Sequence, residues 1–268
     1  MDFQKTFSSF SEWLEFSHSG ALLKPEQIDA LGQAMECKGA IEPLTQAVIE
    51  GNKFEPSAGW REGLAWRGVN SRSRAVMMLI EEALGGAQNP RIFAAEGLTG
   101  FALRLRGLFP RFIGSEYTED PNVRDFMFPI PFEDLQALSF GANQFDLVST
   151  NEVLEHVPSI DLALSEICRV LRPGGWHIGT HPFYFSNENS LVRAVIRDGS
   201  VVHLMEPEYH GNPMSDQGAL VFEIPGWDIL TRAKKAGFSK AEMRFVISTR
   251  HACLADYIGG VFVLCCQK

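Results

Sequence analysis

Three acidic side chains follow short apolar runs of the sequence, at positions that could bind a polar ligand. Glu96 lies in the segment AAEGLTG, Glu116 lies twenty residues further on in IGSEYT, and Asp134 lies in PFEDLQALSF. In a doubly wound sheet, ligands bind beyond the carboxyl ends of the strands, where a carboxylate can accept hydrogen bonds from hydroxyl or amino groups. Each of the three could instead be a solvated loop side chain, so we treat them as candidates for one binding edge.

The turn around Glu96 disfavours a dinucleotide as the ligand. Gly97, Thr99 and Gly100 permit a tight turn before a helix, but Glu96 occupies the position of the first glycine in the G-x-G-x-x-G pattern. A carboxylate there would repel a pyrophosphate bound at the helix N-terminus and would attract an ammonium group instead. The alternative function, a nicotinamide-dependent oxidoreductase, is therefore disfavoured by the carboxylate of Glu96.

The elements that position these side chains form a β-α-β series from residue 91 onward. Short apolar runs alternate there with segments of helical periodicity, which indicates a parallel sheet with crossover helices. The predicted helices are 99–107, 159–171 and 227–237. The predicted strands are 91–95, 111–115, 125–129, 144–150, 174–181, 240–248 and 260–266.

Two parts of the chain lie outside this series. Residues 1–90 are expected to form a helical N-terminal extension, with two short helices within 25–50 and another at 72–84. Residues 183–225 are rich in Asn, His, Pro, Gly and aromatic residues, which favours a lid-like insertion after the fifth strand. We therefore expect a cap over 1–90 and a main domain over 91–268.

The composition narrows the range of partners. A formal net charge of −9 removes the attraction to phosphate on which nucleic-acid binding depends, so we expect no nucleic-acid partner, and the basic cluster of Arg72 and Arg74 is interpreted as a solvated helix start. Five scattered cysteines without a C-x-x-C pair suggest neither a disulfide framework nor a metal site. No signal peptide or membrane span is evident, so we expect a soluble cytoplasmic protein without membrane contact.

Five segments of the sequence occur in an informative order: IFAAEGLTG, IGSEY, FEDLQALSF, FDLVSTNEVLEHVP and RVLRPGGWHIGTHPF. Together they resemble the class I S-adenosylmethionine-dependent methyltransferase family, in its small-molecule, type 11-like branch. The most specific part is FDLVSTNEVLEHV followed by RVLRPGG. The resemblance implies an α/β, Rossmann-like, doubly wound sheet of seven strands with the last strand antiparallel, and S-adenosylmethionine as the cofactor over the strand ends.

The resemblance also assigns roles to individual residues. It implies that Glu96 takes over an acidic role in the first turn, although Ala94, Glu96 and Leu98 stand where the family has its acidic residue and its first two glycines. The implied cofactor residues are Glu96, Gly97, Thr99 and Gly100 at the methionine part, Glu116 at the ribose, Asp134 with Leu135 at the adenine, and Asn151 beside the methyl group. Tyr117, next to Glu116, is a further expected cofactor residue.

The activity that the resemblance implies is methyl transfer to an oxygen or nitrogen of a small molecule. Such acceptors can need a base, for which His181 and His210 are candidates, while an ordinary structural histidine is the alternative at each position. His156 is expected to have a positioning role. A catalytically inactive methyltransferase-fold protein that binds the cofactor or a partner is the second hypothesis, because the first turn departs from the family pattern. A homodimer is left open.

Overall fold

The chain contains two compact units in the computed structural model, which describes residues 1–57, 59–212 and 214–268. One unit combines Met1–Ala87 with Glu242–Cys265, and the other combines Gln88–Ala241 with Cys266–Lys268. The limits expected from the sequence, a cap over 1–90 and a main domain over 91–268, stay a prediction. Among the described residues, no helix is both long and apolar enough to cross a membrane.

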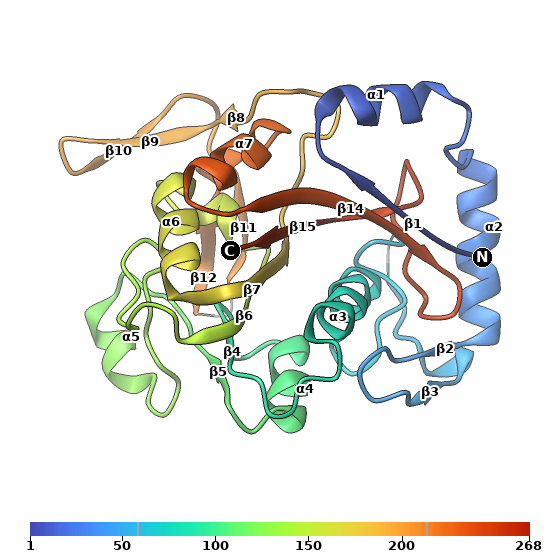
Figure 1. Cartoon of the computed structure of the whole chain (residues 1–268), viewed down its shortest axis with the longest axis horizontal. Helices are drawn as coiled ribbons and strands as arrows, with labels where there is room; N and C mark the ends of the chain where they lie inside the picture. The colour runs from blue at the N-terminus through green and yellow to red at the C-terminus, as the bar shows by residue number, and fades with distance from the viewer. Residues whose placement is uncertain (58, 213) are drawn as a thin grey trace. The chain divides into compact units, whose positions relative to one another are not determined.

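A mixed sheet of seven strands is the main architectural feature (Figure 1). Its strand order is β1-β14-β15-β7-β6-β4-β5, which is typical of the class I methyltransferase fold and confirms the predicted Rossmann-like α/β class. The end of β15 lies beside the start of β7, because Gly174 N donates to Lys268 O (2.9 Å) and Lys268 N donates to Gly175 O (3.0 Å). Neighbouring strands whose opposite ends meet in this way run antiparallel.

The second unit contains the parallel strands that the sequence predicted. β4 pairs with both β5 and β6, and β6 pairs with β7, each in parallel. Ile92, Phe93 and Ala94 of β4 are completely buried, as expected for a strand covered on both faces. The bounds are Ile92–Ala94 for β4, Phe112–Gly114 for β5, Phe145–Asn151 for β6 and Leu171–Thr180 for β7.

Side-chain caps begin the helices between these strands. The hydroxyl of Thr99 accepts a hydrogen bond from Ala102 N, and that of Ser159 accepts one from Leu162 N. The three predicted helices are confirmed within two residues at each end. The bounds are Gly100–Leu108 for α4, Pro121–Phe126 for α5, Leu154–His156 for the 3₁₀ turn η2, Ile160–Val170 for α6 and Asp228–Lys235 for α7.

The strand predicted at 125–129 is wrong. Helix α5 extends to Phe126, and the segment that follows makes only an isolated parallel bridge between Glu116 and Phe132. Pro129 and Pro131 cannot donate backbone hydrogen bonds to a ladder, so this apolar run cannot form an inner strand. Phe126 and Phe128 are instead 86% and 90% exposed.

The first unit is less helical than the sequence suggested. Residues Asp2–Phe7 form β1, which pairs antiparallel with β14 (Lys240–Ser248) from Asp2↔Ser248 to Phe7↔Met243. The second short helix expected within 25–50 is also wrong, since β2 (Ala40–Ile41) and β3 (Val48–Ile49) pair there. The other elements are α1 (Phe10–His18), α2 (Pro25–Lys38), the 3₁₀ turn η1 (Gly51–Lys53), α3 (Ser71–Leu84) and β15 (Val261–Gln267).

An aromatic cluster forms the core of the first unit. The ring of Trp13 lies 5.0 Å from that of Phe262 and 5.4 Å from that of Phe7, both edge to face. Phe245 lies 5.1 Å from Phe262, so β1, α1, β14 and β15 all contribute to this cluster. The burial of Phe7 and Trp13 explains why the first residues of the chain are held in the sheet.

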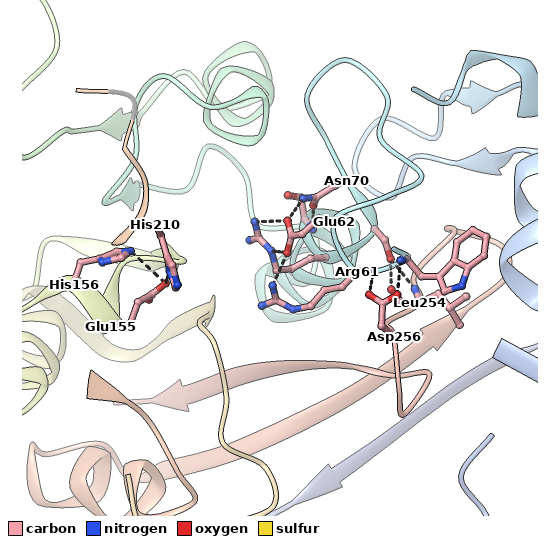
Figure 2. Close-up of polar contacts among 12 residues, drawn as sticks. Arg61, Glu62, Asn70, Glu155, His156, His210, Leu254 and Asp256 are labelled. Carbon is pink, nitrogen blue, oxygen red and sulfur yellow. Dashed lines mark hydrogen bonds and ion pairs between the residues drawn. The ribbon is translucent and has the colours of Figure 1, made fainter. Parts of the chain in front are cut away.

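Arg74 is a buried structural cation and not the solvated side chain that the sequence suggested. Its Nε donates to His251 O (2.6 Å), its Nη1 to Val69 O (2.9 Å) and its Nη2 to Ala252 O (2.8 Å). Burial lowers the pKa of Arg74 to about 10, so the guanidinium stays charged at neutral pH. Arg72 pairs with Glu62, which also accepts from Asn70 at the start of α3 (Figure 2).

The insertion at 183–225 consists of short antiparallel ribbons. β9 pairs with β10, β11 with β12, and β8 with β13, and the β9–β10 hairpin extends outward from the rest of its unit (Figure 1). The bounds are Leu191–Val192 for β8, Ala194–Arg197 for β9, Ser200–His203 for β10, Tyr209–Asn212 for β11, Ser215–Leu220 for β12 and Glu223–Ile224 for β13.

Replacement of Arg74 by Met should destabilise the protein by at least about 3 kcal/mol, because three buried carbonyl oxygens lose their donors. Arg197→Met, at an exposed position of β9, is the matched control and should change stability by less than about 0.5 kcal/mol. Urea denaturation followed by circular dichroism measures both. Equal midpoints for the two variants would contradict this role of Arg74.

Candidate active site

The turn after β4 holds Glu96 through two side-chain donors. The hydroxyl of Thr99 donates to Oε2 of Glu96, and Nδ2 of Asn151 donates to its Oε1 at 2.6 Å. Glu96 and Asn151 are both buried, with exposed fractions of 7% and 8%. The turn therefore joins the carboxyl ends of β4 and β6, and it brings together three of the residues expected at the cofactor.

Glu116, at the end of β5, holds the backbone of the same turn. Its Oε1 accepts hydrogen bonds from Gly97 N (2.8 Å) and Leu98 N (3.1 Å). Burial raises the pKa of Glu116, against the opposing effect of these two amides. The carboxylate of Glu116 therefore links the end of β5 to the turn after β4, at the predicted binding edge.

A close approach of two backbone segments makes this link possible. A Cβ added at Gly114 would lie 2.7 Å from Glu96 O and 3.0 Å from the Cα of Gly97. Real Cβ atoms essentially never lie closer than 3.0 Å to a neighbouring atom, so β5 can approach the turn this closely because residue 114 has no side chain. The glycines of the usual family pattern lie in the first turn, whereas here one lies on the neighbouring strand.

Asp134 and Leu135 lie in a loop that returns to the end of β5. Glu116 N donates to Pro131 O (3.0 Å), and Glu133 N donates to Glu116 O (3.2 Å), which places this loop beside the second strand. Leu135 is buried, and Oδ1 of Asp134 accepts from Gln136 N at 2.8 Å. Asp134 therefore stabilises its own turn, and it lies at the predicted binding edge of the sheet.

Tyr117 follows Glu116 and is half exposed. Its ring lies 5.5 Å from that of Phe132, in a tilted arrangement. Partial burial, with smaller contributions from Glu119 and Asp134, raises its pKa, so the phenol is neutral at physiological pH. Its position beside Asp134 fits a place at the same edge.

Asn151 ends β6 next to the end of β7. It is paired with Thr180, and the chain then turns sharply at Glu152, whose φ of +53° is unusual for a residue with a side chain. The Oδ1 of Asn151 is buried and accepts no hydrogen bond from a described residue. An unsatisfied acceptor inside a protein is costly, so this atom points to a donor from a bound molecule.

His181 directly follows β7 and is buried. Its Nδ1 lies 3.0 Å from Pro182 O, and because a carbonyl oxygen only accepts, this nitrogen carries the proton. His177 on the same strand is also buried, 2.9 Å from the hydroxyl of Thr150, and burial lowers its pKa to about 3. His181 thus lies beside the strand end that carries Asn151, at the edge where the sequence placed it.

His210 belongs to a different cluster from the residues of the first turn. It lies with Glu155 and His156 (Figure 2). Its Nδ1 is 3.8 Å from Oε1 of Glu155, and its Nε2 is 3.1 Å from Oε1 of Glu208. The interaction with Glu155, aided by Glu208, raises the pKa of His210 to about 8. The cluster links the segment EVLEH to the insertion.

The sequence analysis missed several residues that shape this region. The sequence suggests that Glu155 is a helix-start acid, yet it is completely buried in η2. Gly114 was not singled out, and Glu133, next to Asp134, is the more buried carboxylate, accepting from Ser139 N at 2.8 Å. The sequence signal for Glu155 was its adjacency to His156, because a carboxylate beside a histidine is a pair of potential metal ligands.

A family model described as a methyltransferase domain matches residues 115–179. This segment includes β6, η2, α6 and nearly all of β7. It therefore contains Asn151, Glu155 and His156. The central part of this chain is therefore similar to a methyltransferase domain. No curated protein matches the chain.

Solved structures with similar folds are only distant relatives. An S-adenosylmethionine-dependent methyltransferase from Mesorhizobium loti is 14% identical, with 72% of this chain and 98% of that chain covered and a TM-score of 0.44. The [4+2]-cyclase SpnF is 16% identical, with 92% and 97% covered and a TM-score of 0.46. This chain spans about half the length of two other similar structures. It covers 46% of a putative sarcosine dimethylglycine methyltransferase from Galdieria sulphuraria and 51% of a chain in a complex of a methyltransferase activator with a putative methyltransferase from Haloferax volcanii.

Replacement of Gly114 by Ala should destabilise the protein by about 1–3 kcal/mol, because the new methyl group must displace the backbone of the first turn. Gly107→Ala in α4 is the matched control, since a Cβ there meets nothing within 4 Å. It should be neutral or stabilising by up to about 1 kcal/mol. Thermal unfolding of both variants measures the difference, and an unaffected Gly114→Ala would show that the turn can move away freely.

Proposed function

We propose that this protein binds S-adenosylmethionine and transfers its methyl group to a small-molecule acceptor. The observation that carries the proposal is the set of buried polar groups at the ends of β4, β5 and β6, within a chain whose residues 115–179 match a methyltransferase domain. The acceptor is an oxygen or nitrogen nucleophile under this proposal.

The residues present fit the cofactor at three points. The buried Oδ1 of Asn151 accepts no hydrogen bond from the described part of the chain, and the cofactor brings ammonium and hydroxyl donors. Oε1 of Glu116 is used by backbone amides, which leaves its other oxygen to accept from ribose hydroxyls. Gly97 and Gly100 keep the turn open to the methionine part, and Asp134 with Leu135 and Tyr117 would hold the adenine.

Glu96 fits the family's acidic role from a shifted position. Because Thr99 and Asn151 both donate to it, its charge is held at the turn and favours an ammonium group there. When bound, the cofactor supplies an electrophilic methyl group on a sulfonium. The chain's own contribution is to orient that ligand and the acceptor and to exclude water.

We propose His181 as the base for acceptors that must lose a proton. It directly follows Thr180, the partner of Asn151 in the parallel pairing of β6 and β7. The proton on Nδ1 is fixed by the carbonyl of Pro182, so Nε2 is the nitrogen that would take a proton from the acceptor. His210 is less suited to this task, because its raised pKa keeps it protonated near neutral pH.

Calorimetric titration with S-adenosylmethionine and S-adenosylhomocysteine tests the binding step. Glu116→Ala should weaken both affinities by about 1–3 kcal/mol through lost charge-assisted hydrogen bonds. Glu119→Ala, three residues away and exposed, is the matched control and should bind like the wild type. Release of S-adenosylhomocysteine with a panel of hydroxyl and amine acceptors then tests transfer. If neither nucleoside binds at millimolar concentration, the inactive alternative is favoured.

Cofactor affinity should fall as the pH is lowered from neutrality toward the ordinary pKa of a glutamate. Burial raises the pKa of Glu116 above the ordinary value of 4.5, so its carboxylate is protonated at a higher pH than that of a solvated glutamate. Protonation removes the charge that accepts from the ribose. Glu116→Gln should bind more weakly at neutral pH and lose this part of the pH dependence. An unchanged pH profile in Glu116→Gln would assign the effect to another group.

A further inference from the structure

A buried carboxylate and two imidazoles converge at one point of the second unit (Figure 2). Oε1 of Glu155 lies 3.5 Å from Nε2 of His156 and 3.8 Å from Nδ1 of His210. One ligand atom from each of the three residues lies within 4.8 Å of the other two. Glu155 is completely buried, yet neither of its carboxylate oxygens accepts a hydrogen bond from a described residue.

The outer contacts of the two imidazoles determine which nitrogens face Glu155. Nδ1 of His156 lies 2.9 Å from the carbonyl oxygen of Leu220, and Nε2 of His210 lies 3.1 Å from a carboxylate oxygen of Glu208. Both partners only accept, so these nitrogens carry the protons. A metal ion competes with the proton at Nδ1 of His210, so in the metal-binding form both imidazoles are neutral and the lone pairs of their other two nitrogens face the carboxylate. Three acceptors facing one another need a positive charge between them.

We infer that Glu155, His156 and His210 bind a divalent transition-metal ion. A tetrahedral ion with bonds of about 2.0–2.1 Å holds its ligand atoms about 3.4 Å apart. The distances from Oε1 of Glu155 to the nitrogens of His156 and His210, 3.5 Å and 3.8 Å, are close to this value. Two imidazoles favour zinc, cobalt or iron over magnesium, which prefers oxygen ligands.

The surroundings have the features of a metal centre. Imidazole ligands in such sites commonly donate their other N–H to a carboxylate or a backbone carbonyl, which fixes the ring and its tautomer. Leu220 O and Glu208 do this here, and Glu208 is itself held by Arg193 at 3.1 Å. Gly218 lets β12 approach His210 closely, since a Cβ there would lie 2.5 Å from His210 O.

Three protein ligands leave coordination positions open to a further molecule. The side chain of His210 is 32% exposed, so water or a substrate oxygen can reach the ion from that side. Glu155 follows Asn151 by four residues and lies in η2, the turn after the strand that Asn151 ends. Resting on the function proposed above, the acceptor would be a small molecule that offers a hydroxyl or carboxylate oxygen to this ion.

Titration of the full chain with cobalt chloride, followed by visible absorption, tests the metal site without cofactor or acceptor. Cys37, the exposed cysteine, is first replaced by Ser, and the protein is treated with a chelator and dialysed. We expect one cobalt ion per chain with visible bands that zinc displaces. Because no nucleoside is present, failure of this test is independent of failure of the proposed function.

Matched variants connect the binding to these residues. Glu155→Gln should abolish cobalt binding, and its amide can donate to an imidazole, so the fold should persist. His210→Ala should weaken binding by more than about 100-fold, and Glu208→Gln by about 10- to 100-fold. His203→Ala, at an exposed histidine of the same insertion, should bind like the wild type.

Two results would overturn the proposal. One is the absence of saturable binding at one ion per chain, which would mean that a proton on an imidazole supplies the positive charge. The other is equal cobalt affinity in His210→Ala and His203→Ala. Circular dichroism checks that Glu155→Gln folds. If it does not fold, His210→Ala decides the question, because His210 lies on a partly exposed strand of a hairpin.

Discussion

The hydrogen bonds from the first turn to Glu116 are the interaction on which the binding edge depends. They join the end of β4 to the end of β5, and they require the close backbone approach that Gly114 permits. A carboxylate that accepts from two amides is fixed in direction while it keeps an oxygen for a ligand. The turn is thereby formed before any ligand arrives, which lowers the entropy lost on binding.

A second carboxylate supports the same turn from the opposite side. Glu96 is held by Thr99 and Asn151, so both acidic groups of the turn are fixed in place by neutral donors. This arrangement explains how a first turn with few glycines can retain its shape. The family's glycines let the backbone approach a ligand, whereas here two carboxylates and one glycine on the next strand hold the backbone in place.

The insertion contributes a side chain to the cluster around Glu155. Its β11–β12 ribbon places His210 against Glu155, which the sequence separates by more than fifty residues. Glu155 is buried and its carboxylate accepts no hydrogen bond from the part of the chain that the structure describes, so its charge needs a cation or a proton at this place. The ribbon is therefore coupled to the end of β6, and the composition of the insertion gave no sign of this coupling.

Outside the segment 125–129 and the insertion at 183–225, the sequence by itself determined the alternation of strands and helices from residue 91 onward, because apolar periodicity and capping residues act locally. It also placed Glu96, Glu116 and Asn151 at strand ends, because each directly follows a buried run. It could not find β1, whose partner β14 lies more than two hundred residues away. It assigned a strand to 125–129 from hydrophobicity, where two prolines prevent a ladder.

Only the tertiary structure decided how the candidate side chains are used. The sequence offered Glu96 and Asn151 as separate ligands of a cofactor, and the fold makes them partners of each other. It offered His210 as a base, and the fold surrounds it with Glu155, His156 and Glu208. Such contacts depend on which strands pair and which loops return to the sheet. These are long-range events, and their energies come from burial that no local pattern encodes.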